Sequence, residues 1–221
     1  MLRLSIDAKA TVNIGEFSRN GASRVKTKAL DHDFKPEAQV TPVGIFLPRQ
    51  DELHLFMVTT KVTSDCLADC LTSFWNEQQH RFPLTKTLLI NSDNGPECHS
   101  RRTQFMARIV EFVEKTGLTI RLAYYPPYHS KYNPVERCWG ILENHWNGSL
   151  LDTVEAVEHF ASSMTWNGVN PIVKTIANKY ELGVKLTKDA MQALEKKLER
   201  LPELGKWFID IKPQSPTLST G

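Results

Sequence analysis

The sequence is poor in cysteine and lacks any long run of apolar residues. Four cysteines occur among its 221 residues, at irregular spacings, which excludes a disulfide-dense secreted scaffold. The apolar runs are too short to cross a membrane, and no stretch near the first methionine has the length of a signal peptide. We therefore expect a cytoplasmic protein without a membrane partner.

A strong excess of charge of one sign is also absent. The formal net charge is +2, and 41% hydrophobic with 24% charged residues allow a buried core. The length fits one large domain, which we expect over residues 1–212, followed by a disordered polar tail over 213–221. The near-neutral charge neither requires nor excludes a nucleic-acid partner, because a basic groove can exist locally.

The cysteines allow two interpretations. Cys66 and Cys70 are one helical turn apart in a predicted amphipathic helix, and Cys98 is followed directly by His99. Buried thiols in a reducing cytosol are the interpretation that we favour. A zinc site that uses Cys98 and His99 is the alternative, although adjacent ligands do not match the usual CxxC spacing.

The periodicity of apolar residues predicts an α/β fold. Residues 2–7 alternate as a strand, and Val12 and Ile14 predict a second strand that pairs with the first as a hairpin through 8–10. Further strands are predicted over 53–58, 87–90, 118–122 and 207–211, and helices over 64–79, 105–116, from Pro134 onwards, 151–166 and 187–200. Ser64 and Asn133 are the predicted N-caps of the first and third helices. This is the order of a ribonuclease H-like fold, a mixed central sheet flanked by helices, although other α/β folds also alternate strands and helices.

Three acidic residues occupy positions where α/β proteins place site residues. Asp7 lies on the polar face of the first strand, Asp93 follows the strand over 87–90, and Glu136 lies in the helix turn after Pro134. If those two strands are neighbours, both aspartates meet at one edge of the sheet. Phosphodiester transfer uses such carboxylates to hold two magnesium ions about 3.5–4 Å apart, which activate the attacking oxygen and stabilise the leaving one.

Each acid also has a simpler interpretation. Asp93 belongs to Asp-Asn-Gly, which is a common turn sequence. Glu136 stands three residues after Asn133, close to a capping-box arrangement, and the helix dipole favours an acid there. Asp7 fits a solvated strand residue. Only the joint pattern of the three favours a site.

Three segments resemble the DDE domains of bacterial insertion-sequence transposases, and most of all the Rhodopirellula-type group: Ser5–Asp7, Ser92–Gly95 and Tyr124–Glu136. The last segment is the most specific, because a proline-, serine- and asparagine-containing aromatic loop runs into a glutamate. The similarity continues through Asn144–Gly148 and Gly205–Ile209, so it covers nearly the whole chain. Tc1/mariner transposases and integrases are more distantly similar. Such transposases carry an N-terminal helix-turn-helix region, which we expect to be absent here.

The resemblance implies a function and a set of site residues. Asp7, Asp93 and Glu136 would form the catalytic triad and bind Mg²⁺ or Mn²⁺, as two ions. The implied activity is metal-dependent cleavage at the transposon end, followed by attack of the freed 3′-hydroxyl on target DNA. The implied partners are transposon-end and target DNA, with a homodimer as the assembly and no small-molecule cofactor. Ser130 and Asn133 match the loop that positions the glutamate helix.

Polar residues around the proposed site are predicted to contact DNA. Lys131 and Arg137 flank the glutamate, and Ser130 and Asn133 belong to the same loop. The other basic candidates are Arg24, Lys26, Lys28, Arg101, Arg102 and Arg108. A solvated surface charge is the simpler interpretation of each. Three tyrosines are predicted to pack the loop, with base stacking as the alternative: Tyr125, Tyr128 and Tyr132.

Two other functions compete with an active transposase domain. The first is an inactive transposase remnant that acts only as a DNA- or protein-binding module. The second is an unrelated α/β hydrolase of small phosphoesters. For the chain by itself we expect DNA binding that is weak, salt-sensitive and indifferent to sequence.

Overall fold

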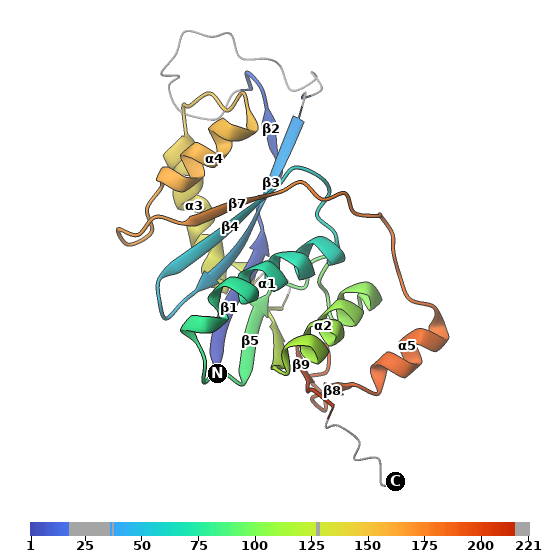
Figure 1. Ribbon diagram of the computed structural model, residues 1–221. Coiled ribbons are helices and arrows are strands. Elements are labelled where there is room, and N and C mark those ends of the chain that lie inside the picture. Colours follow the sequence, from blue (N-terminus) through green and yellow to red (C-terminus); the bar gives the residue numbers. More distant parts are fainter. Residues whose placement is uncertain (18–35, 37, 127–128, 215–221) are drawn as a thin grey trace, which may run out of the picture.

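The computed structural model describes residues 1–17, 36, 38–126 and 129–214 (Figure 1). Its strands are β1 (Leu2–Ala8), β2 (Val12–Ile14), β3 (Ala38–Leu47), β4 (Glu52–Val58), β5 (Thr87–Ser92), β6 (Thr119–Tyr124), β7 (Ile172–Ile176), β8 (Leu198–Arg200) and β9 (Phe208–Ile211). Its helices are α1 (Ser64–Gln78), α2 (Thr103–Thr116), α3 (Pro134–Trp146), α4 (Val154–Ser163) and α5 (Lys188–Glu195), with short 3-10 turns η1 (Gln79–Arg81) and η2 (Ser130–Tyr132). None of these described helices is long and apolar enough to cross a membrane.

The described strands form one mixed sheet, in the order β7-β4-β3-β1-β5-β6-β9-β8, with β2 paired to β3 beside that path. β5 lies parallel to both β1 and β6, whereas β3 runs antiparallel between β1 and β4. These central strands and the helices on both faces form the ribonuclease H-like fold that the order of predicted elements indicated. Because β1, β5 and β6 are parallel, their carboxyl ends lie at one edge of the sheet, where α/β proteins place their sites.

The predicted hairpin between the first two strands is wrong. β1 and β2 both pair with β3, through Asp7 opposite Gly44 and Val12 opposite Val40. The two strands therefore follow each other along one partner in the same direction. The connection Ala8–Ala10 contains none of the glycine, asparagine or aspartate residues that tight hairpin turns require.

β3 was not predicted, because Pro42 and Gly44 weaken the strand pattern of its ten residues. Pro42 lies where β1 has ended and β2 has not begun, and its carbonyl accepts the backbone N–H of Lys9 at 2.8 Å. The N and O atoms of a strand residue point to the same side, so the missing N–H of Pro42 faces this break and interrupts no ladder.

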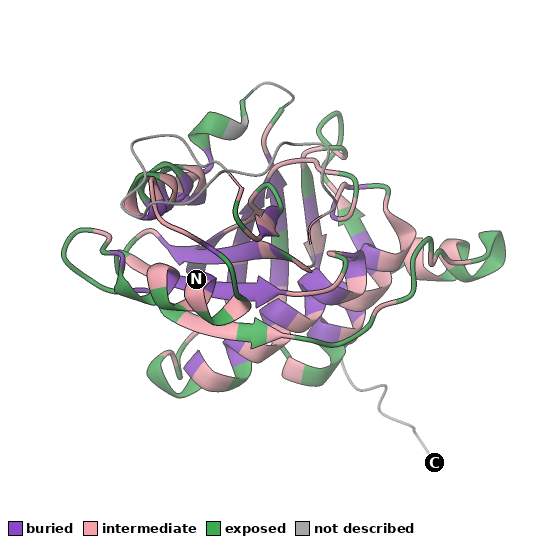
Figure 2. Cartoon of the chain, turned by 90° about the horizontal axis from the view of Figure 1, so that it is seen from above, coloured by how far each residue is buried: buried purple, intermediate pink, exposed green. Residues whose placement is uncertain are grey.

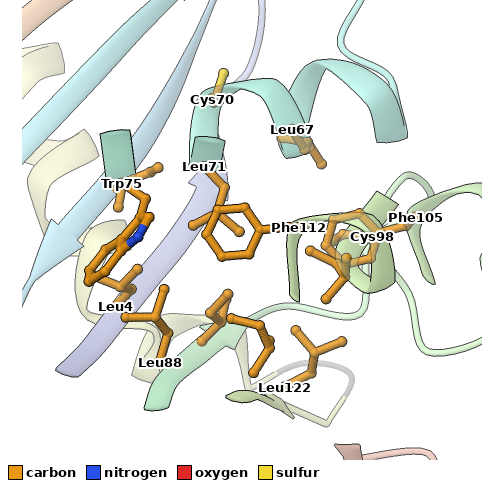
Figure 3. Close-up of a cluster of buried hydrophobic side chains, with 14 of the residues drawn as sticks. Leu4, Leu67, Cys70, Leu71, Trp75, Leu88, Cys98, Phe105, Phe112 and Leu122 are labelled. Atoms are coloured by element: carbon orange, nitrogen blue, oxygen red, sulfur yellow. The ribbon is translucent and has the colours of Figure 1, made fainter. Parts of the chain in front are cut away.

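Helices cover both faces of the sheet and enclose two hydrophobic clusters. One cluster lies between the sheet and α1 and α2, and includes Leu4, Leu71 and Phe112 (Figure 3). The second lies between the sheet and α3 and α4, and includes Leu55 and Trp146. The central strands are therefore buried on both faces, as the purple ribbon in Figure 2 shows. This packing holds β1 and β5 in place, and with them Asp7 and Asp93 at their carboxyl ends.

The C-terminal third departs most from the prediction. The helix predicted over 187–200 ends at Glu195, and residues 198–200 form β8, which pairs with β9. The strand predicted over 207–211 is confirmed as β9. β7 was not predicted, because its five residues are half-exposed and alternate weakly. The predicted cap Ser64 is instead the first residue of α1, and Thr63 caps the helix by accepting the backbone N–H of Cys66.

Candidate active site

Asp7 lies near the carboxyl end of β1, at the edge of the sheet. Its Oδ2 atom accepts a hydrogen bond from Nε1 of Trp139, on α3, at 2.7 Å. Burial raises the pKa of Asp7 from 3.8 to about 7, the Trp139 bond opposes this rise, and the charges of Glu136 and Asp93 add to it. The surroundings of Asp7 therefore disfavour its negative charge unless a cation is close by.

Asp93 directly follows β5, the strand beside β1. The parallel register pairs Leu2 with Leu88 and Ser5 with Asn91, so its continuation by two places sets Asp93 level with Asp7. The Oδ1 atom of Asp93 accepts the backbone N–H of Gly95 at 3.2 Å. Asp93 therefore has the turn role that Asp-Asn-Gly predicts, and it also lies at the carboxyl end of its strand, as predicted.

Glu136 lies in the first turn of α3, which is fastened to β1 by Ser5. The Ser5 hydroxyl accepts the backbone N–H of Val135 at 2.9 Å and donates to Oδ1 of Asn133 at 2.5 Å. The Asn133 amide also donates to the carbonyl of Ile6 at 3.1 Å. A residue of β1 therefore caps the helix that carries Glu136.

This arrangement differs from the capping box considered for Glu136. Asn133 is the N-cap residue of α3, as predicted, but its side chain makes no hydrogen bond to the helix N-terminus. Its amide faces β1 instead. The cap that Asn133 leaves open is supplied by Ser5.

A cavity of about 270 Å³ opens beside Asp7 and Asp93. Its walls come from β1, β5, β6, α1 and α2 and are mostly apolar, with Leu67, Phe105 and Leu122 among them. Apolar walls lower the local dielectric constant, so charges at the mouth of this cavity interact more strongly than they would in water.

The three acids influence one another without forming a closed metal site. Glu136 and Asp93 both act on the charge of Asp7. Among the described residues, however, no three histidine, cysteine, aspartate or glutamate side chains gather closely enough to hold a metal ion. The structure therefore presents an open set of carboxylates at the sheet edge.

The basic residues predicted to contact DNA fall into two groups. Lys131 and Arg137 are exposed next to Glu136, with the Lys131 ammonium 5.3 Å from the centre of the Tyr132 ring. Arg102 instead forms an ion pair with Glu97 at 3.2 Å. Arg108 is likewise held by acidic neighbours, namely Asp65, Asp69 and Glu111. The contact of Arg102 with DNA stays a prediction, although its guanidinium already has an acidic partner.

Asn133 also differs from its predicted role as a DNA contact. Its side chain is fully buried and bonded to Ser5 and Ile6, so it offers no surface to nucleic acid. Ser130 begins η2, but its side chain lies outside the described part of the chain. Other predicted contacts fall outside the described residues altogether: Arg24, Lys26, Lys28 and Tyr128.

Two tyrosines of the loop can be placed. The Tyr125 hydroxyl accepts a hydrogen bond from Arg3 at 3.4 Å, and its ring is half-buried. Tyr132 is 56% exposed and stacks on His129 with 5.8 Å between ring centres. Packing is thus the role of Tyr125, whereas Tyr132 presents an open ring beside the site.

Sequence reasoning missed two residues that shape the site. Trp139 follows Glu136 by three positions, so both lie on the same side of α3, and this spacing is the signal that could have found it. Gly44 lies opposite Asp7 on β3, and a Cβ atom there would come within 2.6 Å of Trp139 and 2.8 Å of Val135. No local sequence signal marks Gly44, because its role depends on a helix ninety residues away.

The cysteines are buried and free, as favoured from the sequence. Burial raises the pKa of Cys98 to about 12. Its Sγ atom points instead to Ser92, at 3.3 Å, and to Asp93. These contacts and the absence of any metal-holding group among the described residues argue against a zinc site at Cys98 and His99.

The family model of the Rhodopirellula transposase DDE domain matches residues 2–213. The chain belongs to this family of transposase DDE domains.

Solved structures with a similar fold include two of the Mos1 transposase. One is its paired-end complex with the left transposon end, at 11% identity, and the other is the Mos1 mariner paired-end complex with Mn, at 12%. Both have a TM-score of 0.49, and each match covers 72% of this chain and 46% of the Mos1 chain. The chain thus spans less than half the length of these structures. No curated protein sequence matches it.

Proposed function

We propose that the chain is the catalytic domain of a transposase, which cuts and rejoins DNA by metal-dependent phosphoryl transfer. Asp7, Asp93 and Glu136 are the proposed metal-binding residues. The observation that carries this proposal is the placement of a half-buried Asp7 level with Asp93, where two neighbouring carboxylates help burial to raise the Asp7 pKa to about 7. A fold tolerates such a cluster when a cation neutralises it.

The donor atoms suit Mg²⁺ or Mn²⁺. All are carboxylate oxygens, the hard ligands that these ions prefer, and magnesium sites commonly use one or two carboxylates plus substrate phosphates and water. The open arrangement of the acids is consistent with a site that DNA completes. A bound divalent cation would lower the pKa of the attacking water or hydroxyl and stabilise the leaving oxygen, with two ions as the expected number.

The chain's own residues then have distinct tasks. Asp7 is oriented by Trp139, which holds one carboxylate oxygen. Asp93 is held by its turn, where Gly95 donates to Oδ1. Ser5 fixes the start of α3 and with it the position of Glu136. These contacts of Asp7 and Asp93 and the fixed start of α3 support the proposal, because preorganisation lowers the cost of assembling a site.

The proposed partners are transposon-end DNA and target DNA. Lys131 and Arg137, exposed beside Glu136, are the proposed contacts to phosphates next to the reacting one. A homodimer is part of the proposal as well, since the two DNA ends of one element must be brought together.

A non-catalytic DNA- or protein-binding module is the second candidate. The observation that favours it is the open arrangement of the three acids, since the described residues contain no ready-made metal site. Metal binding separates the two candidates, because only the catalytic one needs it.

The test is Mn²⁺-dependent nicking of supercoiled DNA, combined with Mn²⁺-dependent thermal stabilisation. We expect nicking by the wild-type chain and none by Asp93→Asn or Glu136→Gln with the fold retained. The matched control is Glu199→Gln, since Glu199 lies on β8 in an exposed ion pair with Lys212. Unchanged nicking and unchanged stabilisation in both site variants would refute the assigned site.

A further inference from the structure

Residues 177–187 cross the protein as a strap without regular secondary structure, from β7 at one edge of the sheet to α5 (Figure 1). The strap is anchored along its length. The Thr60 hydroxyl donates to the carbonyl of Asn178 at 2.7 Å, and the Tyr180 hydroxyl donates to Asp69 at 3.1 Å. Farther on, the backbone N–H of Leu186 donates to the Thr103 hydroxyl at 3.0 Å. These bonds hold the strap against the N-terminal ends of α1 and α2.

A groove of about 610 Å³ lies between the strap and the turn that joins β4 to α1. We call it the strap groove; its described lining is Pro36, Ala38, Gln39, Thr59, Thr60, Lys61, Lys179, Tyr180 and Leu182. The described part of this lining contains two lysines, Lys61 and Lys179, and no acidic residue. None of the ion pairs found among the described residues involves either lysine.

Lys179 is held in place by its neighbours. Asn178 is bonded to Thr60 and Tyr180 to Asp69, so the backbone on both sides of Lys179 is fixed. Both lysines line the groove, Lys61 directly after Thr60 and Lys179 directly after Asn178, and the Thr60–Asn178 hydrogen bond joins these two segments. Two positive charges along one groove suit an extended anion.

The strap groove lies at the same end of the strands as Asp7, namely the carboxyl ends of β1 and β4. β4 runs in the same direction as β1, because both are antiparallel to β3, and the turn at residues 59–61 follows the carboxyl end of β4. β4 is two strands from β1 and extends a few residues beyond the level of Asp7, which places the groove roughly 15 Å from that carboxylate. On one DNA strand this separation is about four nucleotides.

We propose that the strap groove binds the phosphate backbone of the DNA that flanks the reacting phosphodiester, through Lys61 and Lys179. The inference rests on the proposed function, since the groove lies at the same end of the strands as the proposed carboxylates. The strap then serves as a fixed wall that sets the direction in which DNA leaves the site. Phosphate contacts of this kind position DNA without reading its sequence.

The test compares two matched double substitutions in DNA binding. K61Q/K179Q removes both lysines of the groove. K86Q/K196Q removes two exposed lysines at the opposite end of the strands, just before the amino ends of β5 and β8. Binding of a short fluorescein-labelled duplex is measured by anisotropy without divalent metal, over a range of salt concentrations. Circular dichroism and the Tm establish that both variants are folded.

We expect K61Q/K179Q to bind DNA about tenfold more weakly, with a salt dependence that is shallower by about two in the log–log slope. K86Q/K196Q is expected to stay within about twofold of the wild type with an unchanged slope. Equal affinities and equal slopes for the two variants would refute DNA binding by the strap groove.

Nicking distinguishes this failure from failure of the proposed function. If the groove is wrong but the function is right, the wild-type chain still nicks DNA and Asp93→Asn does not. If the wild-type chain neither binds nor nicks DNA, both the groove and the proposed function are overturned.

Discussion

Trp139 donates a hydrogen bond to Asp7 across the gap between α3 and the sheet, at 2.7 Å. The approach is close because Gly44, opposite Asp7 on β3, has no side chain under the indole ring. Trp139 therefore links the helix that carries Glu136 to the strand that carries Asp7. We expect this link to orient Asp7 in the proposed metal site.

Trp139→Phe removes the donor and keeps the ring. Residues that orient a metal ligand typically change metal affinity by 10–100-fold when they are replaced, so we expect Mn²⁺ to bind about tenfold more weakly. The measurement is Mn²⁺-dependent stabilisation in thermal unfolding. Trp166→Phe is the control, because Trp166 makes the same kind of bond, to Asp51 at 3.1 Å, away from the proposed site. Equal Mn²⁺ affinities of the two variants would contradict the orienting role.

Gly44→Ala pushes α3 away from the sheet. The new Cβ atom would lie 2.6 Å from Trp139 Cη2 and 2.8 Å from Val135 Cγ2, and overpacking of this kind costs about 1–3 kcal/mol of unfolding free energy. Gly140→Ala is the matched control, since nothing lies within 4 Å of its Cβ position and alanine favours a helix. Urea unfolding should show a loss for the first variant and no loss for the second.

Asp7→Asn should stabilise the protein at alkaline pH. The pKa of Asp7 is raised from 3.8 to about 7, so the folded chain favours the protonated carboxyl. The protonated Asp7 carboxyl contributes to stability fully below about pH 4, and this contribution is lost as the pH rises to about 7. The substitution should therefore raise the free energy of unfolding by about 1–3 kcal/mol at pH 8 and by little near pH 4. The exposed Asp152→Asn variant should show no such trend in urea unfolding at the two pH values. A gain at pH 4 that equals the gain at pH 8 would mean that burial of the charge is not the cause.

Ser5→Ala removes the hydroxyl that joins β1 to the start of α3. The backbone N–H of Val135 and the amide of Asn133 each lose a buried partner, at a cost of about 2–3 kcal/mol. Thr153→Ala, which removes the ordinary N-cap of α4, should cost about 1 kcal/mol. Equal losses in chemical unfolding would show that Ser5 is no more than a typical cap.

Strands β1, β5 and β6 and the placement of Asp93 beside Asp7 could be predicted from the sequence, whereas the contacts of these side chains could not. Short apolar or alternating runs predict β1, β5 and β6. The Asp-Asn-Gly turn and the proline loop indicate Asp93 and Glu136 as candidates. β3 was missed because of Pro42 and Gly44. Those two residues fit features that lie elsewhere in the chain, namely the break between β1 and β2 and the ring of Trp139.

The same reason explains the other errors. Asn133 is a polar residue near the proposed site, and the sequence alone gives no sign that buried Ser5 already engages it. A short edge strand such as β8 depends on its partner β9 rather than on its own residues, so the sequence pattern extended α5 through it. Local patterns identified elements, and tertiary partners decided the role of single side chains.

The metal-binding role of Asp7, Asp93 and Glu136 is tested most directly by a crystal structure of the chain with DNA and Mn²⁺, in which anomalous scattering locates the metal. We expect an anomalous peak at about 2.0–2.2 Å from carboxylate oxygens of Asp7 and Asp93, with Glu136 turned toward it. The absence of any peak at these residues under saturating Mn²⁺, with the DNA bound, would contradict it.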